Sequence, residues 1–114
     1  MSFSRARASH LGIDAVELKK ARRFYRDHAS RLKNFFSANE ISFISKKKSK
    51  PEALALILAA KEAVFKAIGD AWMGPAGFQN IEVVHDNGRL GFENCRFSIM
   101  RRKDLVIVQC RGEA

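Results

Sequence analysis

The sequence has few of the features that mark membrane or secreted proteins. It contains two cysteines and two prolines among 114 residues, and no apolar run approaches the roughly 20 residues that a membrane-spanning helix needs. The first residues, Met1–Arg7, lack the apolar stretch of a secretory signal. We therefore expect a cytoplasmic protein with no membrane partner, in which Cys95 and Cys110 are free thiols.

The length and composition are typical of one folded domain. Hydrophobic residues make up 46% of the chain and charged residues 29%, which excludes the composition of a disordered protein. Folded domains commonly contain about 100 to 150 residues. We expect a single domain over 1–114, with a flexible N-terminus over 1–9.

Acidic residues are outnumbered by basic ones, 12 to 21, for a net charge of +9. Such a charge indicates an acidic macromolecular partner and says nothing of the fold. Two segments hold much of the excess, Lys19–Arg26 and Lys46–Lys50. A solvated loop is the simpler interpretation of the lysine run. In the first segment, Phe24 and Tyr25 interrupt the basic residues, which favours a helix that docks onto another protein.

Helix signals dominate the first two thirds of the chain. Ser37 and Glu40 have the spacing of a capping box, which predicts a helix that begins near Ala38 and ends before the lysine run. Pro51 suits the first turn of a longer helix, and Gly69 suits its end. The elements expected here are a strand over 10–16, helices over 17–28, from 38 and over 51–67, and a loop over 69–77.

In the last third of the chain, the pattern of apolar residues changes to the two-residue period of a β-strand. Apolar and polar residues alternate over 81–86, and Asp86-Asn87-Gly88 is a hairpin-turn signal. Three further strands are expected over 89–92, 96–100 and 105–110. The order of elements predicts an α+β domain in which an antiparallel sheet packs against a central Ala-rich helix.

The central helix carries charges where its sequence otherwise predicts burial. Its apolar residues cover one arc, and Ala59, Ala60, Ala63 and Ala67 form a second face of small residues. Lys61 projects from the apolar arc, and Glu62 and Lys66 lie one turn apart at its edge. An unpaired buried charge costs several kcal/mol, so these groups require a partner, a metal or a polar cavity.

Two motifs carry a resemblance to a known family. Gly12–Glu17 contains a glycine, an apolar residue, an aspartate and a Val-Glu pair, and Ala60–Ala67 reads Ala-Lys-Glu-Ala followed by Lys-Ala. Phe36–Glu40 and Gly77–Val83 match two weaker segments in the same order. The chain thereby resembles the holo-acyl-carrier-protein synthases, the short class of 4'-phosphopantetheinyl transferases, from about Leu11 to Val108.

The resemblance implies the transferase fold and a reaction. The enzyme would move 4'-phosphopantetheine from coenzyme A to a serine of an apo acyl carrier protein in fatty acid metabolism, releasing adenosine 3',5'-bisphosphate. Asp14 and Glu62 would hold Mg²⁺, which favours one or two carboxylates beside substrate phosphates. Read without the family, Asp14 is a turn or cap residue and Glu62 the partner of Lys66. Glu17 is the next acid, and it could equally be a first-turn helix residue favoured by the helix dipole.

The remaining roles follow from the same resemblance. Glu62 and Lys66 would be catalytic, with Lys66 on the pyrophosphate, and either Glu62 or a metal-bound water would take the serine proton. Lys61 would face the same pocket, unless its amine reaches the surface instead. Further roles are coenzyme binding by Gly69 and Arg101, carrier binding by Lys20, Arg23 and Phe24, and assembly into a homotrimer with sites between subunits.

Three departures from the family pattern lie on the coenzyme side. Ile57 stands where the family usually has an arginine, and Arg101 stands where it usually has a histidine. The loop Gly69–Met73, which includes Ala71 and Met73, lacks the second glycine of the family's phosphate loop. An active transferase with a modified pocket is the leading interpretation. The alternatives are a non-catalytic homologue that binds the carrier and a small basic RNA-binding domain, although no RNA-binding motif supports the latter.

Overall fold

The computed structural model describes residues 11–68, 81–85, 88–93 and 95–112. Its elements in chain order are β1 (Leu11–Glu17), α2 (Leu18–His28), the 3-10 helix η1 (Ala29–Asn34), α3 (Ala38–Lys46), α4 (Lys50–Ile68), β2 (Cys95–Arg102) and β3 (Leu105–Gly112). They form an α+β domain, as expected, and within the described residues no helix is long and apolar enough to cross a membrane.

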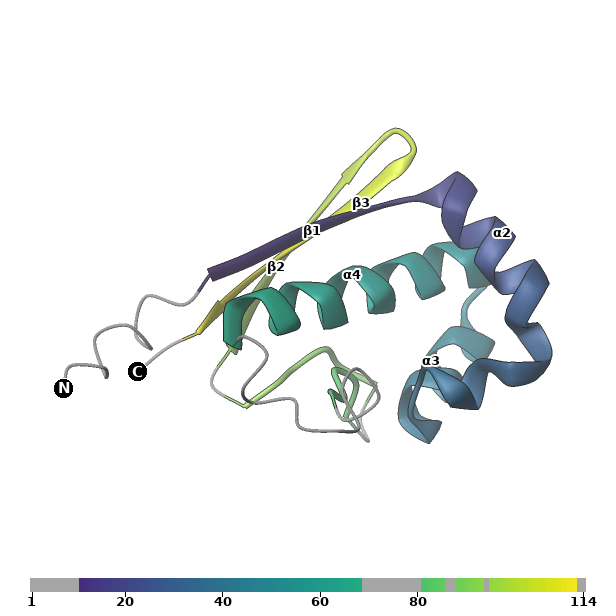
Figure 1. The fold of residues 1–114 in the computed structure, drawn as a ribbon, viewed down its shortest axis with the longest axis horizontal. Coiled ribbons are helices and arrows are strands. Elements are labelled where there is room, and N and C mark those ends of the chain that lie inside the picture. Colours follow the sequence, from purple (N-terminus) through teal and green to yellow (C-terminus); the bar gives the residue numbers. More distant parts are fainter. Residues whose placement is uncertain (1–10, 69–80, 86–87, 94, 113–114) are drawn as a thin grey trace, which may run out of the picture.

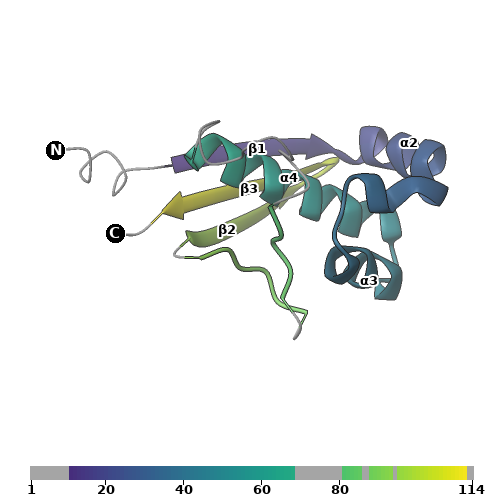
Figure 2. The ribbon, with the colours of Figure 1, turned by 60° about the horizontal axis from the view of Figure 1, so that its bottom comes forward.

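The three strands form one antiparallel sheet in the order β1-β3-β2. Helix α4 lies along one face of this sheet, while α2, η1 and α3 gather at one end of it (Figure 1). Figure 1 also shows α3 and the segments 81–85 and 88–93 on the side of α4 opposite the sheet, and Figure 2 shows the three strands side by side in this order. Because α4 is covered on both sides, both its apolar arc and its alanine face are buried, which is what its sequence predicts.

The core is centred on α4. Strands β1 and β3 present alternate residues to it, and Val106, Val108 and Cys110 of β3 are buried there. From α4 itself, buried side chains include Leu54, Ile57 and Val64. The pKa of the Cys110 thiol rises to about 12 through burial, and both cysteines are free thiols.

The helix predictions are confirmed closely. The capping box is present, because the Ser37 amide donates to Glu40 Oε1 at 3.0 Å and the Glu40 amide donates to Ser37 Oγ at 3.2 Å. Helix α3 ends within the lysine run, at Lys46, one residue later than predicted. Helix α4 exceeds its predicted range by one residue at each end. The 3-10 helix η1 was not predicted.

The prediction of regular strands over 81–85 and 89–92 is wrong. These segments make only isolated bridges in the described residues, between Val84 and Leu90 and between Phe92 and Cys95. The Val83 amide donates to the Glu40 carboxylate instead of to a strand, at 2.8 Å. Val83 and Val84 are both buried, so the segment does not alternate between a core face and a solvent face.

Candidate functional site

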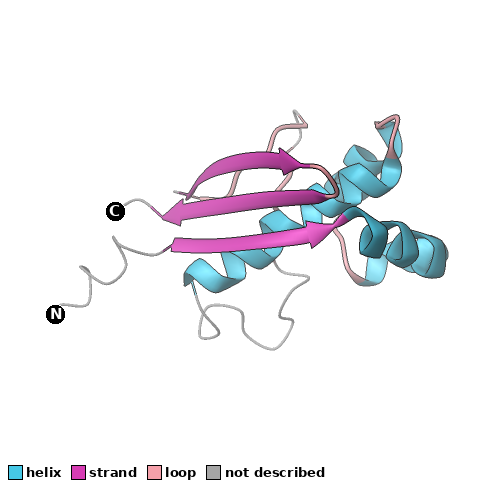
Figure 3. Cartoon of the chain, turned by 90° about the horizontal axis from the view of Figure 1, so that it is seen from above, coloured by secondary structure: helices cyan, strands magenta, loops and turns pink. Residues whose placement is uncertain are grey.

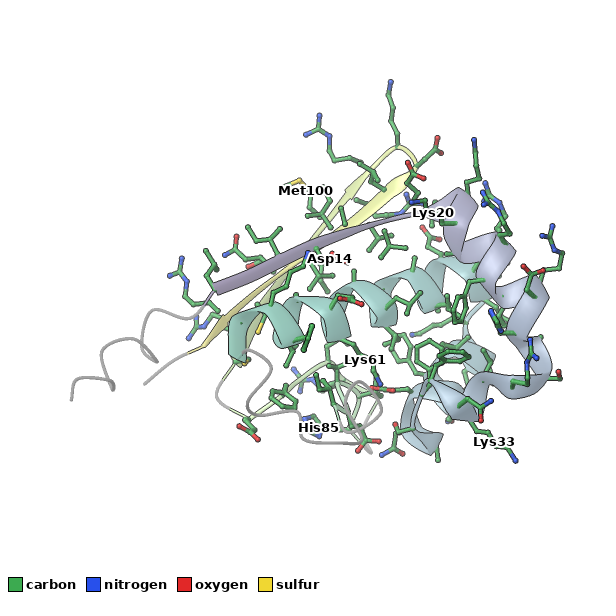
Figure 4. The ribbon with its side chains drawn as sticks, viewed as in Figure 1. Asp14, Lys20, Lys33, Lys61, His85 and Met100 are labelled. Atoms are coloured by element: carbon green, nitrogen blue, oxygen red, sulfur yellow. The ribbon has the colours of Figure 1, made fainter. Side chains whose placement is uncertain are left out.

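Asp14 lies in the middle of β1 on the face turned toward α4, as Figure 4 shows. Its side chain is 18% exposed and accepts a hydrogen bond from Lys66 Nζ at 2.8 Å. The same amine also donates to the carbonyl oxygen of Ile13 at 3.2 Å. Asp14 is therefore a strand residue that faces a helix, and the turn or cap interpretation of it is wrong.

Glu62 stands one turn before Lys66 on α4 and joins the same group. Burial, and after it the charge of Asp14, raise the pKa of the Glu62 carboxyl, while Lys66 acts in the opposite direction. The pKa of Lys66 is raised chiefly by its hydrogen bond with Asp14. The structure thus brings together two carboxylates that repel each other electrostatically and one amine that partly neutralises them.

Gly12 explains how β1 comes so close to α4. A Cβ atom added at Gly12 would lie 2.8 Å from the backbone nitrogen of Ala67 and closer still to the carbonyl oxygen of Ala63. Only glycine fits such an approach without displacing the helix. The first motif therefore supplies both the acid, Asp14, and the residue that lets its strand contact the helix carrying Glu62.

The acidic group is too small to be a complete metal site made of protein alone. Among the described residues, no three His, Cys, Asp or Glu side chains gather where a metal ion could bind. A pair of carboxylates is nevertheless what Mg²⁺ uses when phosphate oxygens and water complete its octahedron. The donor set of Asp14 and Glu62 fits that mode, with the remaining ligands coming from a substrate.

Lys61 does not join this group, and its expected place in the coenzyme pocket is not supported. Its amine donates to Glu40 Oε1 at 2.8 Å and to the carbonyl oxygen of Phe35 at 3.2 Å. Both side chains of this ion pair are 0% exposed, so the amine does not reach the surface either. In Figure 4, Lys61 points away from the sheet and from Asp14.

Glu40 is the partner of Lys61, which the sequence did not reveal. Its carboxylate accepts from Lys61, from the Ser37 amide and from the Val83 amide. It therefore connects α3, α4 and the segment 81–85. The buried position of Lys61 indicated that it needs a partner, but the capping-box spacing accounted for Glu40 locally and nothing in the sequence identified it as that partner.

Arg101 lies on a different part of the molecule from Asp14 and Glu62. Its Nε donates to Glu52 Oε2 at 2.6 Å, and its Nη1 donates to the carbonyl oxygen of Lys103 at 2.6 Å. Glu52 precedes Glu62 by ten residues on α4, which corresponds to about 15 Å along the helix axis. Within one chain, Arg101 therefore does not lie beside Asp14 and Glu62.

A cavity of about 520 Å³ opens beside Arg101. Its walls are mainly apolar, and its charged lining residues include Lys47 and Lys48 of the lysine run, which are exposed side chains as predicted. Ile57, where the family has an arginine, is buried in the core and does not line this cavity. Gly69, Ala71 and Met73 lie outside the described residues.

The basic face of α2 lies at the end of the sheet. Lys20 and Arg23 are exposed, and Figure 4 shows Lys20 near the start of the helix. Phe24 is half-buried, and its ring contacts those of His28 and Phe35 at centroid distances of 4.5 and 5.1 Å. Phe24 thus anchors α2 to the domain and presents only part of its ring to solvent.

Fold and site together define a small α+β protein with paired acids and a lysine between a strand and a helix. The chain belongs to the 4'-phosphopantetheinyl transferase superfamily, because the model of that family matches residues 10–108. This result confirms the resemblance carried by the two motifs.

Curated relatives agree with this assignment. The holo-[acyl-carrier-protein] synthase of Geotalea daltonii is 37% identical over 81 residues, which cover 70% of this chain and 63% of the relative. That of Clostridium kluyveri is 34% identical over 73 residues, which cover 64% and 54%. The matched part of the chain therefore spans less than two thirds of the length of these relatives.

Solved structures show the same fold. The holo-[acyl-carrier-protein] synthase of Neisseria meningitidis superposes with a TM-score of 0.73 at 21% identity, covering 92% of this chain and 98% of the other. The enzyme of Bacillus anthracis, solved in complex with CoA (3',5'-ADP), gives a TM-score of 0.70 at 24% identity, covering 93% and 97%. Because both sequence identities are below 25%, these two matches show a shared fold only.

Proposed function

We propose that this protein is a holo-acyl-carrier-protein synthase. It transfers 4'-phosphopantetheine from coenzyme A to a serine of an apo acyl carrier protein and releases adenosine 3',5'-bisphosphate. The observation that carries the proposal is the juxtaposition of Asp14, Glu62 and Lys66 between β1 and α4. A fold without catalytic use gains little from two mutually repelling carboxylates at this contact.

The reaction requires positive charge around a pyrophosphate. A serine hydroxyl must attack a group that is already anionic, so positioning and charge neutralisation supply most of the catalysis. Asp14 and Glu62 would hold Mg²⁺, which when bound offsets charge on the phosphate oxygens. Lys66, which is 51% exposed and now pairs with Asp14, would turn its amine to the pyrophosphate.

The coenzyme would also use the cavity beside Arg101. Arg101, Lys47 and Lys48 give this cavity basic side chains, and its apolar walls suit the uncharged parts of an elongated ligand. Because the cavity and the two carboxylates occupy different parts of one chain, we propose that a site is completed by the carboxylates of one subunit and the cavity of its neighbour.

The surface suited to such assembly is the outer face of the sheet, which we define as the side turned away from α4. Figure 3 shows this face with no helix in front of it. Ile13 and Met100 are 48% and 51% exposed there, and Ala15 and Ile107 lie between them in the strand register. We propose a homotrimer that buries this apolar patch.

The carrier would dock on α2. Acyl carrier proteins are acidic, and the exposed side chains of Lys20 and Arg23 provide complementary charge on this helix. Phe24 contributes the exposed part of its ring and holds α2 in place through its aromatic contacts. Charge reversal at Arg23 should raise KM for the carrier and leave KM for coenzyme A unchanged.

The deciding experiment measures the intact mass of an apo acyl carrier protein after incubation with this protein, coenzyme A and Mg²⁺. We expect a gain of one phosphopantetheine, which Glu62→Gln abolishes. Glu93→Gln, a matched change at an exposed glutamate outside the site, should keep the activity. An equal mass gain with Glu62→Gln would refute the role of the carboxylate pair.

A non-catalytic carrier-binding homologue is the second candidate. Two observations favour it: Ile57 is buried where the family has an arginine, and Glu52 and the Lys103 carbonyl engage Arg101. This function predicts binding of the carrier in a sedimentation or calorimetric assay with no mass gain under the same conditions. The mass assay therefore separates the two candidates directly.

A further inference from the structure

Arg101 is held by a carboxylate in the cavity that we propose for the coenzyme. Its Nε and its Nη2 both contact Glu52 Oε2, and its Nη1 donates to the carbonyl oxygen of Lys103 at 2.6 Å. Arg101 and Glu52 both line the cavity of about 520 Å³. Each of the three guanidinium nitrogens therefore contacts a protein acceptor, and an anionic ligand has to compete with Glu52 for them.

The surroundings of the Glu52 carboxylate favour negative charge. Glu52 lies in the first turn of α4, where the helix dipole stabilises an anion. The basic side chains that line the cavity with it are Lys47, Lys48 and Arg101, and among the described residues Glu52 is the single acid in this lining. The same surroundings would therefore stabilise the phosphate of a ligand in place of the carboxylate.

The ion pair of Glu52 and Arg101 can be opened at low cost. The two side chains are 41% and 43% exposed, so solvent screens their attraction, and exposed ion pairs contribute little to stability. A phosphate group carries more negative charge than a carboxylate and offers three acceptor oxygens to the arginine fork. An incoming phosphate therefore gains by replacing Glu52 on Arg101.

We propose that Glu52 is an internal competitor for Arg101, which a phosphate group of the bound nucleotide displaces. This inference rests on the proposed use of the cavity by coenzyme A. Before the nucleotide binds, Glu52 holds the guanidinium group of Arg101 in the cavity. After the transfer, Glu52 competes for Arg101 again and so weakens the binding of adenosine 3',5'-bisphosphate. Glu52 is thus a residue that sets the affinity of the cavity for the nucleotide.

Calorimetric titration with adenosine 3',5'-bisphosphate at constant ionic strength tests this role. Glu52→Gln should lower Kd by about threefold to fivefold, because the neutral amide competes less strongly for the guanidinium group. Arg101→Gln should raise Kd by about tenfold through the loss of a charge-assisted hydrogen bond. When Arg101→Gln is already present, adding Glu52→Gln should change Kd by less than about twofold, since no arginine remains to be released.

Glu93→Gln is the matched control. It removes one negative charge from an exposed position that does not line the cavity, so Kd should stay the same. An equal gain in affinity from Glu52→Gln with and without Arg101 would overturn the proposal, because it would show a general effect of charge. An unchanged Kd for Glu52→Gln, or no binding by this variant, would overturn it as well.

The outcome is separable from that of the mass assay. Phosphopantetheine transfer together with an unchanged Kd for Glu52→Gln would leave the proposed function standing and remove the role of Glu52. A gain in affinity that depends on Arg101, without any mass gain on the carrier, would support the role of Glu52 and count against the transfer reaction.

Discussion

Removal of the Lys61 amine tests how α4 is held in the core. Lys61 and Lys66 lie on the same helix, and each amine contacts a carboxylate oxygen at 2.8 Å. The two ion pairs differ in exposure, because Lys61 and Glu40 are both 0% exposed whereas Lys66 is 51% exposed. Solvent should therefore screen the second pair and not the first.

We predict that Lys61→Met lowers the free energy of unfolding by about 3–5 kcal/mol, the usual cost of leaving a buried charge without its partner. For a domain of about this size, the loss corresponds to a fall in Tm of roughly 12–20 °C. Lys66→Met should cost no more than about 1 kcal/mol, because Lys66 is 51% exposed and solvent screens its ion pair.

Urea unfolding followed by circular dichroism measures both variants under the same conditions. Adding Glu40→Gln to Lys61→Met should recover part of the loss, since the neutral amide keeps an acceptor for the Ser37 amide and removes the unpaired charge. The reasoning would be refuted if Lys61→Met cost the same as Lys66→Met within the error of the measurement.

Three further predictions concern the site and the core. Gly12→Ala should destabilise the protein by about 1–3 kcal/mol, because the added methyl overlaps the backbone of Ala63; a thermal melt without loss of Tm would contradict the close contact. The pKa of Glu62 is raised in the folded state, so the ionised carboxylate opposes folding. Glu62→Gln should therefore raise Tm at a pH above that pKa, and this gain should vanish at a pH below the ordinary pKa of a glutamate. Thermal melts in the presence of a chelator across this pH range measure the sign of the effect. Burial raises the pKa of both thiols, so an aromatic disulfide reagent should label Cys95 before Cys110 and both more slowly than in urea; prompt labelling of Cys110 in the native protein would contradict its burial.

The helices were predictable because their signals are local. Ser37 and Glu40 are three residues apart, so their capping box can be read from the sequence and is confirmed by both hydrogen bonds. The alanine face of α4 likewise follows from periodicity alone. The strands that paired as expected, β2 and β3, are adjacent in the sequence and joined by a short turn at Lys103-Asp104.

The segments 81–85 and 88–92 pair in part as the hairpin signal predicts, but they do not become regular strands. The His85 amide donates to the Arg89 carbonyl at 3.1 Å and Val84 forms a bridge with Leu90, whereas the Val83 amide donates to the Glu40 carboxylate at 2.8 Å. The carbonyl of Val83 still accepts from the Gly91 amide at 2.9 Å, so the pairing is satisfied on one side only. A contact between residues so far apart in the sequence has no local signature.

The candidate site was predicted from the resemblance more than from the residues. Asp14, Glu62 and Lys66 each have an ordinary local explanation, and only the family motifs placed them together. Lys61 belonged to the same motif, yet the structure directs it to Glu40. A motif identifies which residues matter, whereas the side of the helix from which each one projects depends on the tertiary packing.

The contact of Gly12 with α4 bears on how the protein could be redesigned. Here strand and helix meet through main-chain atoms, with no side chain between them, so the spacing at this point does not depend on the volume of any core residue. Exchanges of Val64 or Val108 for larger or smaller side chains should therefore shift the ends of α4 more than its contact with β1. A redesigned core could in this way gain stability while the separation of Asp14 and Glu62 stays the same.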